Sequence, residues 1–224
     1  MLVGFKEVWQ NKSLLLLTMA FSSFIGLYFS LGNVMSSIFN PIGFSPMQIS
    51  AIGLTMLAFG IIGATLTGWF LDKTNAYKKL LMFLIGISLV TFSLLAHQII
   101  VTRSLTIMIC YMAVLGMAMI SVLPTSLGLG VELSFPLQPA LVNGVMYMFA
   151  QALGCAQSLA YSFTMEVDIN DYATAEEVTE ARQHRIFYLA IVFVVVILFS
   201  LVCLIFVKED LKRLRFNQYK NEEP

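Results

Sequence analysis

The sequence predicts an all-α membrane protein, a polytopic bundle of six transmembrane helices. Of its 224 residues, 58% are hydrophobic and only 12% are charged, whereas soluble domains carry about 25% charged residues. The charges are also segregated, because Asp, Glu, Lys and Arg are absent from the runs 13–71, 80–102, 104–131, 133–165 and 186–207. About 20 apolar residues cross the roughly 30 Å of membrane hydrocarbon as a helix. Helices are favoured over a barrel, since the runs lack the roughly ten-residue alternating pattern of barrel strands.

The first charge-free run is long enough for two crossings. Pro41, Gly43 and Pro46 in its middle predict a turn, because proline and glycine interrupt helices. We therefore expect the first two helices over 13–39 and 47–71. Each later run holds one crossing, expected over 80–101, 104–131, 139–165 and 186–207, and Pro124 should kink the fourth helix. A segment 1–12 precedes this domain, 13–207, and a tail 208–224 follows it.

The positions of Lys and Arg predict the orientation of the bundle. With both termini in the cytoplasm, most basic residues fall on cytoplasmic segments, as the positive-inside rule favours. We expect an integral multi-pass protein of the plasma membrane or an organelle membrane, without a cleaved leader, because the first apolar run far exceeds the 7–15 residues of a signal core. The basic cluster of the tail is typical of an anchor on anionic lipid. The acidic outer loop 166–185 is explained by solvation, and a short surface helix fits part of it.

Several classes of function are disfavoured. A neutral chain is a poor partner for nucleic acid. The sequence contains no HExxH helix, no Gly-rich phosphate loop and no intramembrane pair of Asp residues. Cys110, Cys155 and Cys203 lie in separate crossings without metal-ligand spacing, and His97 and His184 lie at the ends of separate segments. We expect no enzyme, no metal site and no cofactor, which leaves a transporter, a channel or a membrane interaction module.

Between the second and third crossings the chain carries Gly68, Asp72, Lys73 and Lys78. The glycine lets helices approach closely. The aspartate can cap the N-terminus of a neighbouring helix, while the lysines bind helix C-termini and lipid. This pattern predicts a conformational latch, and an ordinary positive-inside loop explains it equally well.

A polar stripe marks the fifth crossing, where the spacing of three or four residues places its members on one helical face. Polar groups on a membrane helix turn away from lipid, toward the bundle or a wet cavity. Interhelical hydrogen bonding, worth about 0.6 kcal/mol per bond, is the alternative. The members of the stripe are Asn143, Tyr147, Gln151, Gly154, Ser158 and Ser162.

Small residues recur at every fourth position of the second crossing. Gly60, Ala64 and Gly68 follow the small-xxx-small pattern that lets two helix backbones touch. We expect another helix to pack closely here. Transporters whose bundles rock against each other also need such a smooth contact.

At these residues the chain resembles the feline leukaemia virus subgroup C receptor family of the major facilitator superfamily. The resemblance covers nearly the whole chain and matches the C-terminal half of that family, helices seven to twelve. The residues that carry it are Ile52-Gly53-Leu54-Thr55, Gly60, Gly63, Gly68, Leu71-Asp72-Lys73-Thr74, Tyr77-Lys78, Leu123-Pro124, Val131-Glu132-Leu133, Pro136, Gly144, Gln151 and Gly154.

The resemblance implies one half of a transporter in which two six-helix bundles rock around a midplane site. Such transporters are described as moving choline or related amines, and haem in competing assignments. By position, Tyr28 and Gln151 match a tyrosine and a glutamine that face the central cavity of the family. Tyr28 would offer an aromatic face to a quaternary ammonium, with core packing as the alternative, and Gln151 would meet a hydroxyl group. With Asn143 and Tyr147 they form the predicted substrate site.

The chain also departs from the family pattern. Gly128 stands where the family commonly has a glutamate, Leu137 and Pro139 stand where it has acids, and Ala140 replaces a glycine. Because these residues differ, the substrate of the family and its carboxylate-based coupling step are less readily assigned to this chain. Glu132 remains, and we expect it to be a structural partner of the latch cations or of a helix N-terminus.

Two functions therefore stay open. The first is transport of a small organic solute as half of a transporter, paired with an N-terminal six-helix half or with a second copy. The second is a truncated or non-transporting membrane interaction module that pairs with another six-helix chain. Retention of Tyr28, Asn143 and Gln151 favours transport, whereas loss of the family acids favours the second function. The expected partners are the lipid bilayer, a small-molecule substrate and the second bundle.

Overall fold

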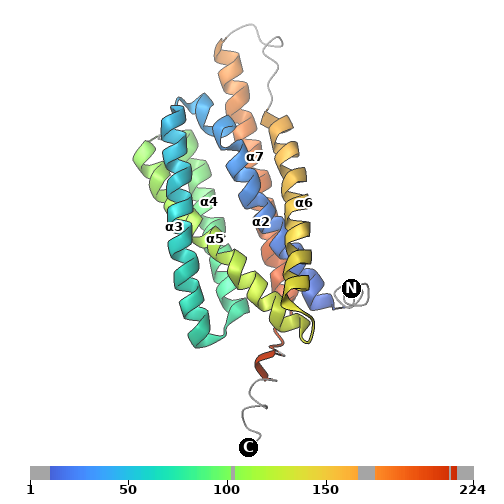
Figure 1. The fold of residues 1–224 in the computed structure, drawn as a ribbon. Coiled ribbons are helices and arrows are strands. Elements are labelled where there is room, and N and C mark those ends of the chain that lie inside the picture. Colours follow the sequence, from blue (N-terminus) through green and yellow to red (C-terminus); the bar gives the residue numbers. More distant parts are fainter. Residues whose placement is uncertain (1–10, 102–103, 166–174, 212, 216–224) are drawn as a thin grey trace, which may run out of the picture.

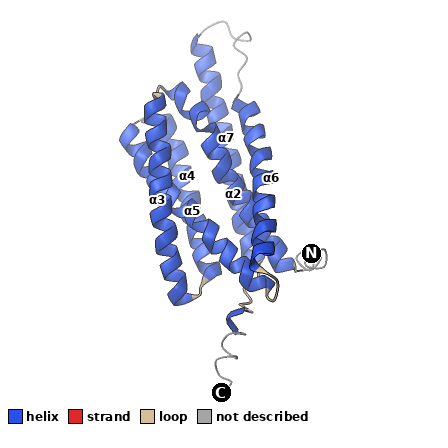
Figure 2. Cartoon of the chain, viewed as in Figure 1, coloured by secondary structure: helices blue, strands red, loops and turns tan. Residues whose placement is uncertain are grey.

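The computed structural model describes residues 11–101, 104–165, 175–211 and 213–215. Over these ranges the chain forms helices and connecting turns without a strand (Figures 1 and 2), and six helices are long and apolar enough to cross a membrane. The predicted all-α membrane bundle is confirmed. Its elements are α2 (Lys12–Phe39), the 3₁₀ turn η1 (Asn40–Ile42), α3 (Pro46–Thr74), α4 (Tyr77–Val101), α5 (Leu105–Ser134), α6 (Pro139–Met165) and α7 (Ala175–Phe206).

Local sequence explains where the first two helices begin and end. The Asn11 side chain accepts hydrogen bonds from two backbone N–H groups of the first turn of α2, which satisfies donors that lack a partner inside the helix. After η1, Gly43 adopts φ 99°, a left-handed conformation that suits glycine. Ser45 and Gln48 then form a capping box at the start of α3. The predicted turn between the first two crossings is therefore a 3₁₀ turn closed by glycine.

Two helices extend beyond the charge-free runs. The last helix was expected to begin at residue 186, but α7 begins at Ala175, so part of the predicted outer loop is continuous with the last crossing. Within α7 the membrane span is His184–Phe206. Likewise α3 continues to Thr74, which places the predicted latch residues Asp72 and Lys73 in its last helical turn. Charge marks the edge of the hydrocarbon, and a helix need not end there.

The arrangement of the helices follows from α2, which lies at the centre of the bundle. Of its most apolar stretch 72% is buried, against 28% for α3 and for α6. It packs against α5, α6 and α7, while α4 packs against α5 and α7. The start of α2 and the helical turn 213–215 lie at the same end of the bundle (Figure 1). We call this the terminal end; it also holds the α3–α4 and α5–α6 turns.

Helices α3 and α5 make the most extensive contact in the bundle. A Cβ atom added at Gly60 would overlap Ile120, and one added at Gly63 would lie 2.5 Å from the Met117 carbonyl oxygen. At Gly68, however, no atom lies within 4 Å of an added Cβ among the described residues. The small-residue contact predicted for Gly60, Ala64 and Gly68 therefore does not continue to Gly68. The reason is that α5 runs obliquely, from beside α3 to the base of α6 (Figure 1).

Candidate functional site

The polar stripe of α6 meets α2 where the two helix backbones touch. A Cβ atom added at Gly26 would lie 3.0 Å from the Gly154 backbone nitrogen, and one added at Gly154 would lie 3.1 Å from the Gly26 Cα. The Ser30 hydroxyl spans this contact, at 2.8 Å from the Gly26 carbonyl oxygen and 3.1 Å from that of Gly154. Such close crossings rely on glycine because a side chain would separate the helices.

On either side of this crossing, side-chain hydrogen bonds also join α2 and α6. The Asn33 amide donates to the Ser158 hydroxyl at 2.7 Å, and the Gln157 amide lies 3.5 Å from the Ser23 carbonyl oxygen. Gly154 and Ser158 of the predicted stripe thus face α2, so interhelical hydrogen bonding accounts for Ser158. Sequence reasoning missed Asn33 and Gln157. The spacing of Gly26, Ser30 and Asn33 on α2 repeats the pattern that marked α6 and could have drawn attention to Asn33.

Lower on α6, two predicted substrate residues are half-buried. The Tyr147 ring packs edge-on against Phe21 of α2, with centroids 6.0 Å apart. The Asn143 side-chain oxygen is buried and has no hydrogen-bond partner among the described residues. Such an oxygen can accept a hydrogen bond from water or a ligand, because a buried polar atom is costly when unpaired.

The other two predicted substrate residues differ in exposure. Tyr28 of α2 is half-buried, and its ring packs against Phe29 with centroids 5.5 Å apart. Gln151 of α6 is exposed, as is Ser162 farther along the same stripe. Their contact with a substrate stays a prediction.

A groove of about 490 Å³ lies between α2 and α6. Its walls are largely apolar and include Thr18, Ser22 and Ser23 of α2 and Val145, Phe149 and Leu153 of α6. None of the four predicted substrate residues lines this groove. Within the single bundle the structure therefore does not gather Tyr28, Asn143, Tyr147 and Gln151 around this space.

At the terminal end, Lys78 links α4 to α7. Its ammonium donates to the carbonyl oxygens of Ile205 at 2.8 Å and Val207 at 2.6 Å. A cation is stabilised at a helix C-terminus by unpaired carbonyls and by the helix dipole. In return, the Glu209 carboxylate accepts a hydrogen bond from the Lys78 backbone N–H at 3.2 Å, in the first turn of α4. The C-terminal end of α7 is thus capped by a side chain of α4, and the N-terminal end of α4 is capped by a side chain from the segment after α7.

The other predicted latch residues do not make this kind of link. Asp72 is exposed on the last turn of α3, and its expected capping of a helix N-terminus is not seen among the described residues. The Lys73 ammonium lies over the Trp69 ring, 3.8 Å from the centroid. Gly68 faces open space. Their role as a latch stays a prediction.

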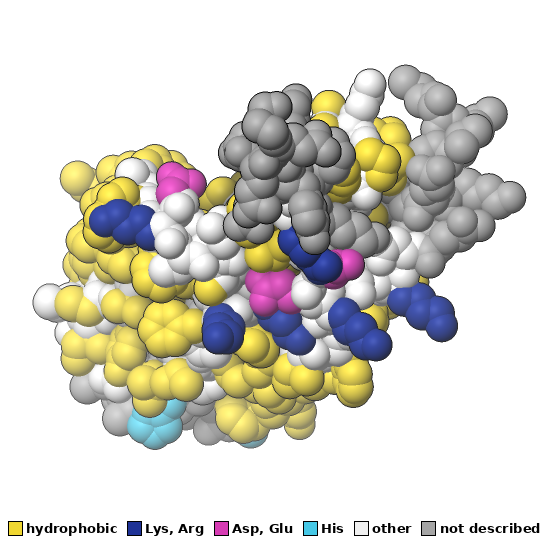
Figure 3. All heavy atoms as spheres, turned by 90° about the horizontal axis from the view of Figure 1, so that it is seen from below, with side chains coloured by type: hydrophobic (Ala, Val, Ile, Leu, Met, Phe, Trp, Pro, Cys, Tyr) yellow, Lys and Arg dark blue, Asp and Glu magenta, His cyan; other side chains and the backbone are white. Residues whose placement is uncertain are grey.

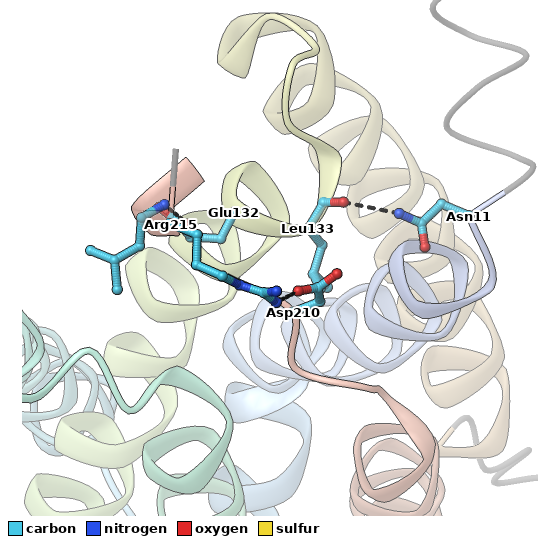
Figure 4. Close-up of polar contacts among 6 residues, drawn as sticks. Asn11, Glu132, Leu133, Asp210 and Arg215 are labelled. Atoms are coloured by element: carbon cyan, nitrogen blue, oxygen red, sulfur yellow. Dashed lines mark hydrogen bonds and ion pairs between the residues drawn. The ribbon is translucent and has the colours of Figure 1, made fainter. Parts of the chain in front are cut away.

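Polar contacts also hold the ends of α2 and α5 and the segment after α7 together (Figure 4). The Asn11 amide donates to the Leu133 carbonyl oxygen at 2.9 Å. The Glu132 carboxylate accepts a hydrogen bond from the Leu214 backbone N–H at 3.0 Å, in the helical turn 213–215. Asp210 and Arg215 form an ion pair. Glu132 thus accepts from the backbone of a short helical turn, which agrees with one of the two structural partners expected of it, a helix N-terminus.

The glycine that departs from the family pattern has a local explanation. A Cβ atom added at Gly128 would lie 2.9 Å from the ring of Tyr77, so the tyrosine occupies the space that a larger side chain would need. The glutamate that is common in the family would require Tyr77 to move.

Comparisons with known proteins agree with this architecture. No model of a known protein family matches the chain. The chain is 27% identical over 221 residues to choline/ethanolamine transporter FLVCR1 of Mus musculus, and the match covers 94% of this chain and 36% of that protein. It is 25% identical over 215 residues to choline/ethanolamine transporter flvcr2a of Danio rerio, covering 93% and 41%. With solute carrier family 49 member A3 of Xenopus tropicalis it shares 23% over 154 residues, covering 68% and 32%.

The predicted resemblance is confirmed by these matches. The chain spans between 31% and 41% of the length of the first curated relatives it matches, which is consistent with half of a transporter of this kind. Together with its six apolar helices, these relatives identify an integral, multi-pass membrane protein.

Proposed function

We propose that this chain is one six-helix bundle of a membrane transporter that moves a small organic solute of the choline class by alternating access. The relatives named choline/ethanolamine transporters match 93% and 94% of the chain, which supports this substrate class. Transport of this kind needs a second bundle, because substrate sites lie between two bundles that rock against each other.

The observation that carries the proposal is the exposed polar face of α6. Its span has the lowest mean hydropathy of the six, yet only 28% of its most apolar stretch is buried. Gln151 and Ser162 are exposed on it, among apolar residues such as Leu159 and Phe163. Polar side chains in a membrane helix turn toward protein or water rather than lipid. A second bundle, with a wet cavity between the two, would give this face the environment it lacks.

Within that cavity we assign the substrate to Tyr28, Asn143, Tyr147 and Gln151. Aromatic faces attract a quaternary ammonium within about 6 Å, worth roughly 0.5–2 kcal/mol. The unpaired oxygen of Asn143 and the exposed amide of Gln151 supply neutral hydrogen-bonding groups for a hydroxyl. Recognition without a carboxylate is consistent with Gly128, Leu137 and Pro139 standing at positions where the family has acids.

The proposed second bundle is either an N-terminal six-helix half or a second copy of this chain. It would lie against α6 and α3, whose membrane spans are mostly exposed. Gly68 faces open space on α3 and would let another helix approach closely. We propose that Gly68, Asp72, Lys73 and Lys78 then act as the latch between conformations.

We further propose that the terminal end faces the cytoplasm. Lys and Arg side chains are spread over this end of the molecule (Figure 3), and the positive-inside rule then places both termini inside. The membrane is the plasma membrane or that of an organelle.

Transport is tested by uptake of radiolabelled choline into cells that express the chain alone, or with the N-terminal six helices of an FLVCR-type relative. We expect uptake above the vector control in at least one assembly. In an active assembly, Gln151→Ala should lower uptake about tenfold with unchanged surface level, because a hydrogen bond to the substrate is lost. Ser162→Ala is the matched control on the same exposed face and should retain uptake.

Two results would count against these assignments. Uptake at the vector level in both assemblies favours the alternative function, a non-transporting interaction module. Equal uptake by Gln151→Ala and the wild type would place Gln151 among packing residues.

A further inference from the structure

The carboxylates of the terminal end are largely used in contacts within the protein. Glu209 accepts from the backbone of Lys78, Glu132 accepts from the backbone of Leu214, and Asp210 pairs with Arg215. These contacts hold the segment after α7 across the end of the bundle (Figure 4). Asp72 is the exception, because it is exposed on the last turn of α3, and Glu209 is exposed although it accepts the hydrogen bond from Lys78.

The cations of the same end are left facing outward. Lys73, Lys79, Lys208 and Arg213 are all exposed. They lie around the start of α4: Lys79 is in its first turn, and Lys208 follows Val207, whose carbonyl oxygen binds Lys78. Seen from this end, basic side chains are spread over a face bordered by hydrophobic ones (Figure 3). These four exposed cations outnumber the exposed carboxylates of this end, Asp72 and Glu209, so the described part of the face presents a surplus of positive charge.

An exposed aromatic residue marks the depth of these cations in the membrane. Trp69 is 61% exposed on the last turns of α3, and tryptophan on a membrane protein prefers the headgroup level. The Lys73 ammonium lies over its ring at 3.8 Å. Phe70 and Phe206 are exposed at the ends of α3 and α7. Lys73 and its neighbours are thus placed where lipid headgroups, rather than bulk water, are the nearest anions.

We propose that the terminal end is a binding surface for anionic phospholipid, with the headgroup at Lys73 and Lys79 beside Trp69. Lys208 and Arg213 add to the positive electrostatic potential of this surface. A lipid without net charge would not be attracted by it. A basic residue near an anionic membrane contributes about 1 kcal/mol, which corresponds to roughly a fivefold preference per cation. The proposal does not depend on transport, because lipid selectivity is measured without substrate.

The test uses Trp69 as a reporter. The sequence has two tryptophans, so Trp9→Phe leaves Trp69 as the fluorescent one. The full chain is reconstituted in phosphatidylcholine bilayers that contain increasing brominated phosphatidylserine or brominated phosphatidylcholine, whose bromines quench nearby tryptophan. We expect phosphatidylserine to be preferred at least fivefold, and Lys73→Gln with Lys79→Gln to lower this preference at least fivefold.

Matched variants separate charge from folding. Lys73→Arg with Lys79→Arg keeps both charges and should keep the preference, and an unchanged far-UV circular dichroism spectrum and thermal midpoint show that each variant is folded. Equal quenching by both brominated lipids would overturn the proposal, and so would an unchanged preference in the double glutamine variant. Loss of the preference on adding millimolar inorganic phosphate would also overturn it, because the surface would then bind a free anion rather than a lipid.

Discussion

At Gly26 and Gly154 the absence of two side chains fixes how α2 and α6 pack. The backbones touch there, and the Ser30 hydroxyl lies within hydrogen-bond distance of both carbonyl oxygens. At Gly60, by contrast, an added Cβ would meet the Ile120 side chain, which can yield. At the crossing of α2 and α6 each glycine meets backbone, which cannot move without displacing a helix.

We therefore expect Gly26→Ala to lower the thermal unfolding midpoint in detergent by several degrees. The new Cβ would lie 3.0 Å from the Gly154 backbone nitrogen, and overpacking of this kind costs about 1–3 kcal/mol. Gly32→Ala is the control on the same helix, because an added Cβ there meets nothing within 4 Å and alanine favours a helix by about 1 kcal/mol. Equal midpoints for the two variants would show that the close crossing does not limit stability.

The spacing on α6 predicted part of this contact and missed the rest. Residues three or four positions apart share a face, which correctly grouped Gly154 with Ser158. Spacing within one helix does not say which residues of another helix it meets, so Asn33 and Ser30 were not found. Gln157 was missed because it lies beside the stripe, and its long side chain still reaches Ser23.

On the scale of the elements, α4 and α7 stabilise each other at the terminal end. Lys78 binds the last carbonyls of α7, and Glu209 caps the first turn of α4. Both contacts place a charge at the helix end whose partial charge is opposite. The two helices also pack against each other along their length, so the caps join ends that the bundle already brings together.

Replacing Lys78 by methionine keeps the aliphatic stem and removes the ammonium. We expect a loss of about 1–2 kcal/mol in stability, since charge-assisted caps at partly buried helix ends reach that size. Hydrogen exchange followed by mass spectrometry should accelerate in the last turn of α7 and the segment that follows. Lys79→Met is the matched control, because Lys79 is exposed in the same turn. An unchanged exchange rate in the Lys78 variant would mean that side-chain packing alone holds this end.

The helix ends show what charge patterns can and cannot predict. Charge-free runs predicted six membrane crossings, because an unpaired charge is excluded from hydrocarbon. They did not predict that α7 begins at Ala175 or that α3 reaches Thr74, because a helix continues into water as long as its backbone bonds are made. Asp72 and Lys73 consequently lie on a helix rather than in the predicted loop.

On the scale of the whole molecule, the bundle has a dry core and unequal outer faces. Apolar residues from all six membrane helices fill its core, and the exposed face of α3 is apolar, with Leu54, Ile61 and Leu66 outward. The exposed surface of α6 is mixed, with Gln151 and Ser162 beside apolar residues such as Leu159 and Phe163. An apolar face suits lipid or another helix, whereas the polar side chains of α6 disfavour lipid. The spacing of polar residues on α6 predicted this face, but the proposed second bundle would supply the surface opposite it, so the shape of a completed site could not be predicted from this sequence.

Cys155 offers a direct test of whether that missing surface is a second copy of the chain. It is exposed on α6, Cys110 is exposed on α5, and Cys203 is buried. If two copies pair through α6, a bifunctional maleimide added to membranes should link them into a dimer through Cys155. Cys155→Ser should abolish the dimer and Cys110→Ser should not, because α5 packs elsewhere, against α3 and α4. Dimers that persist in Cys155→Ser would contradict pairing through α6, and monomers alone would leave an N-terminal half as the partner.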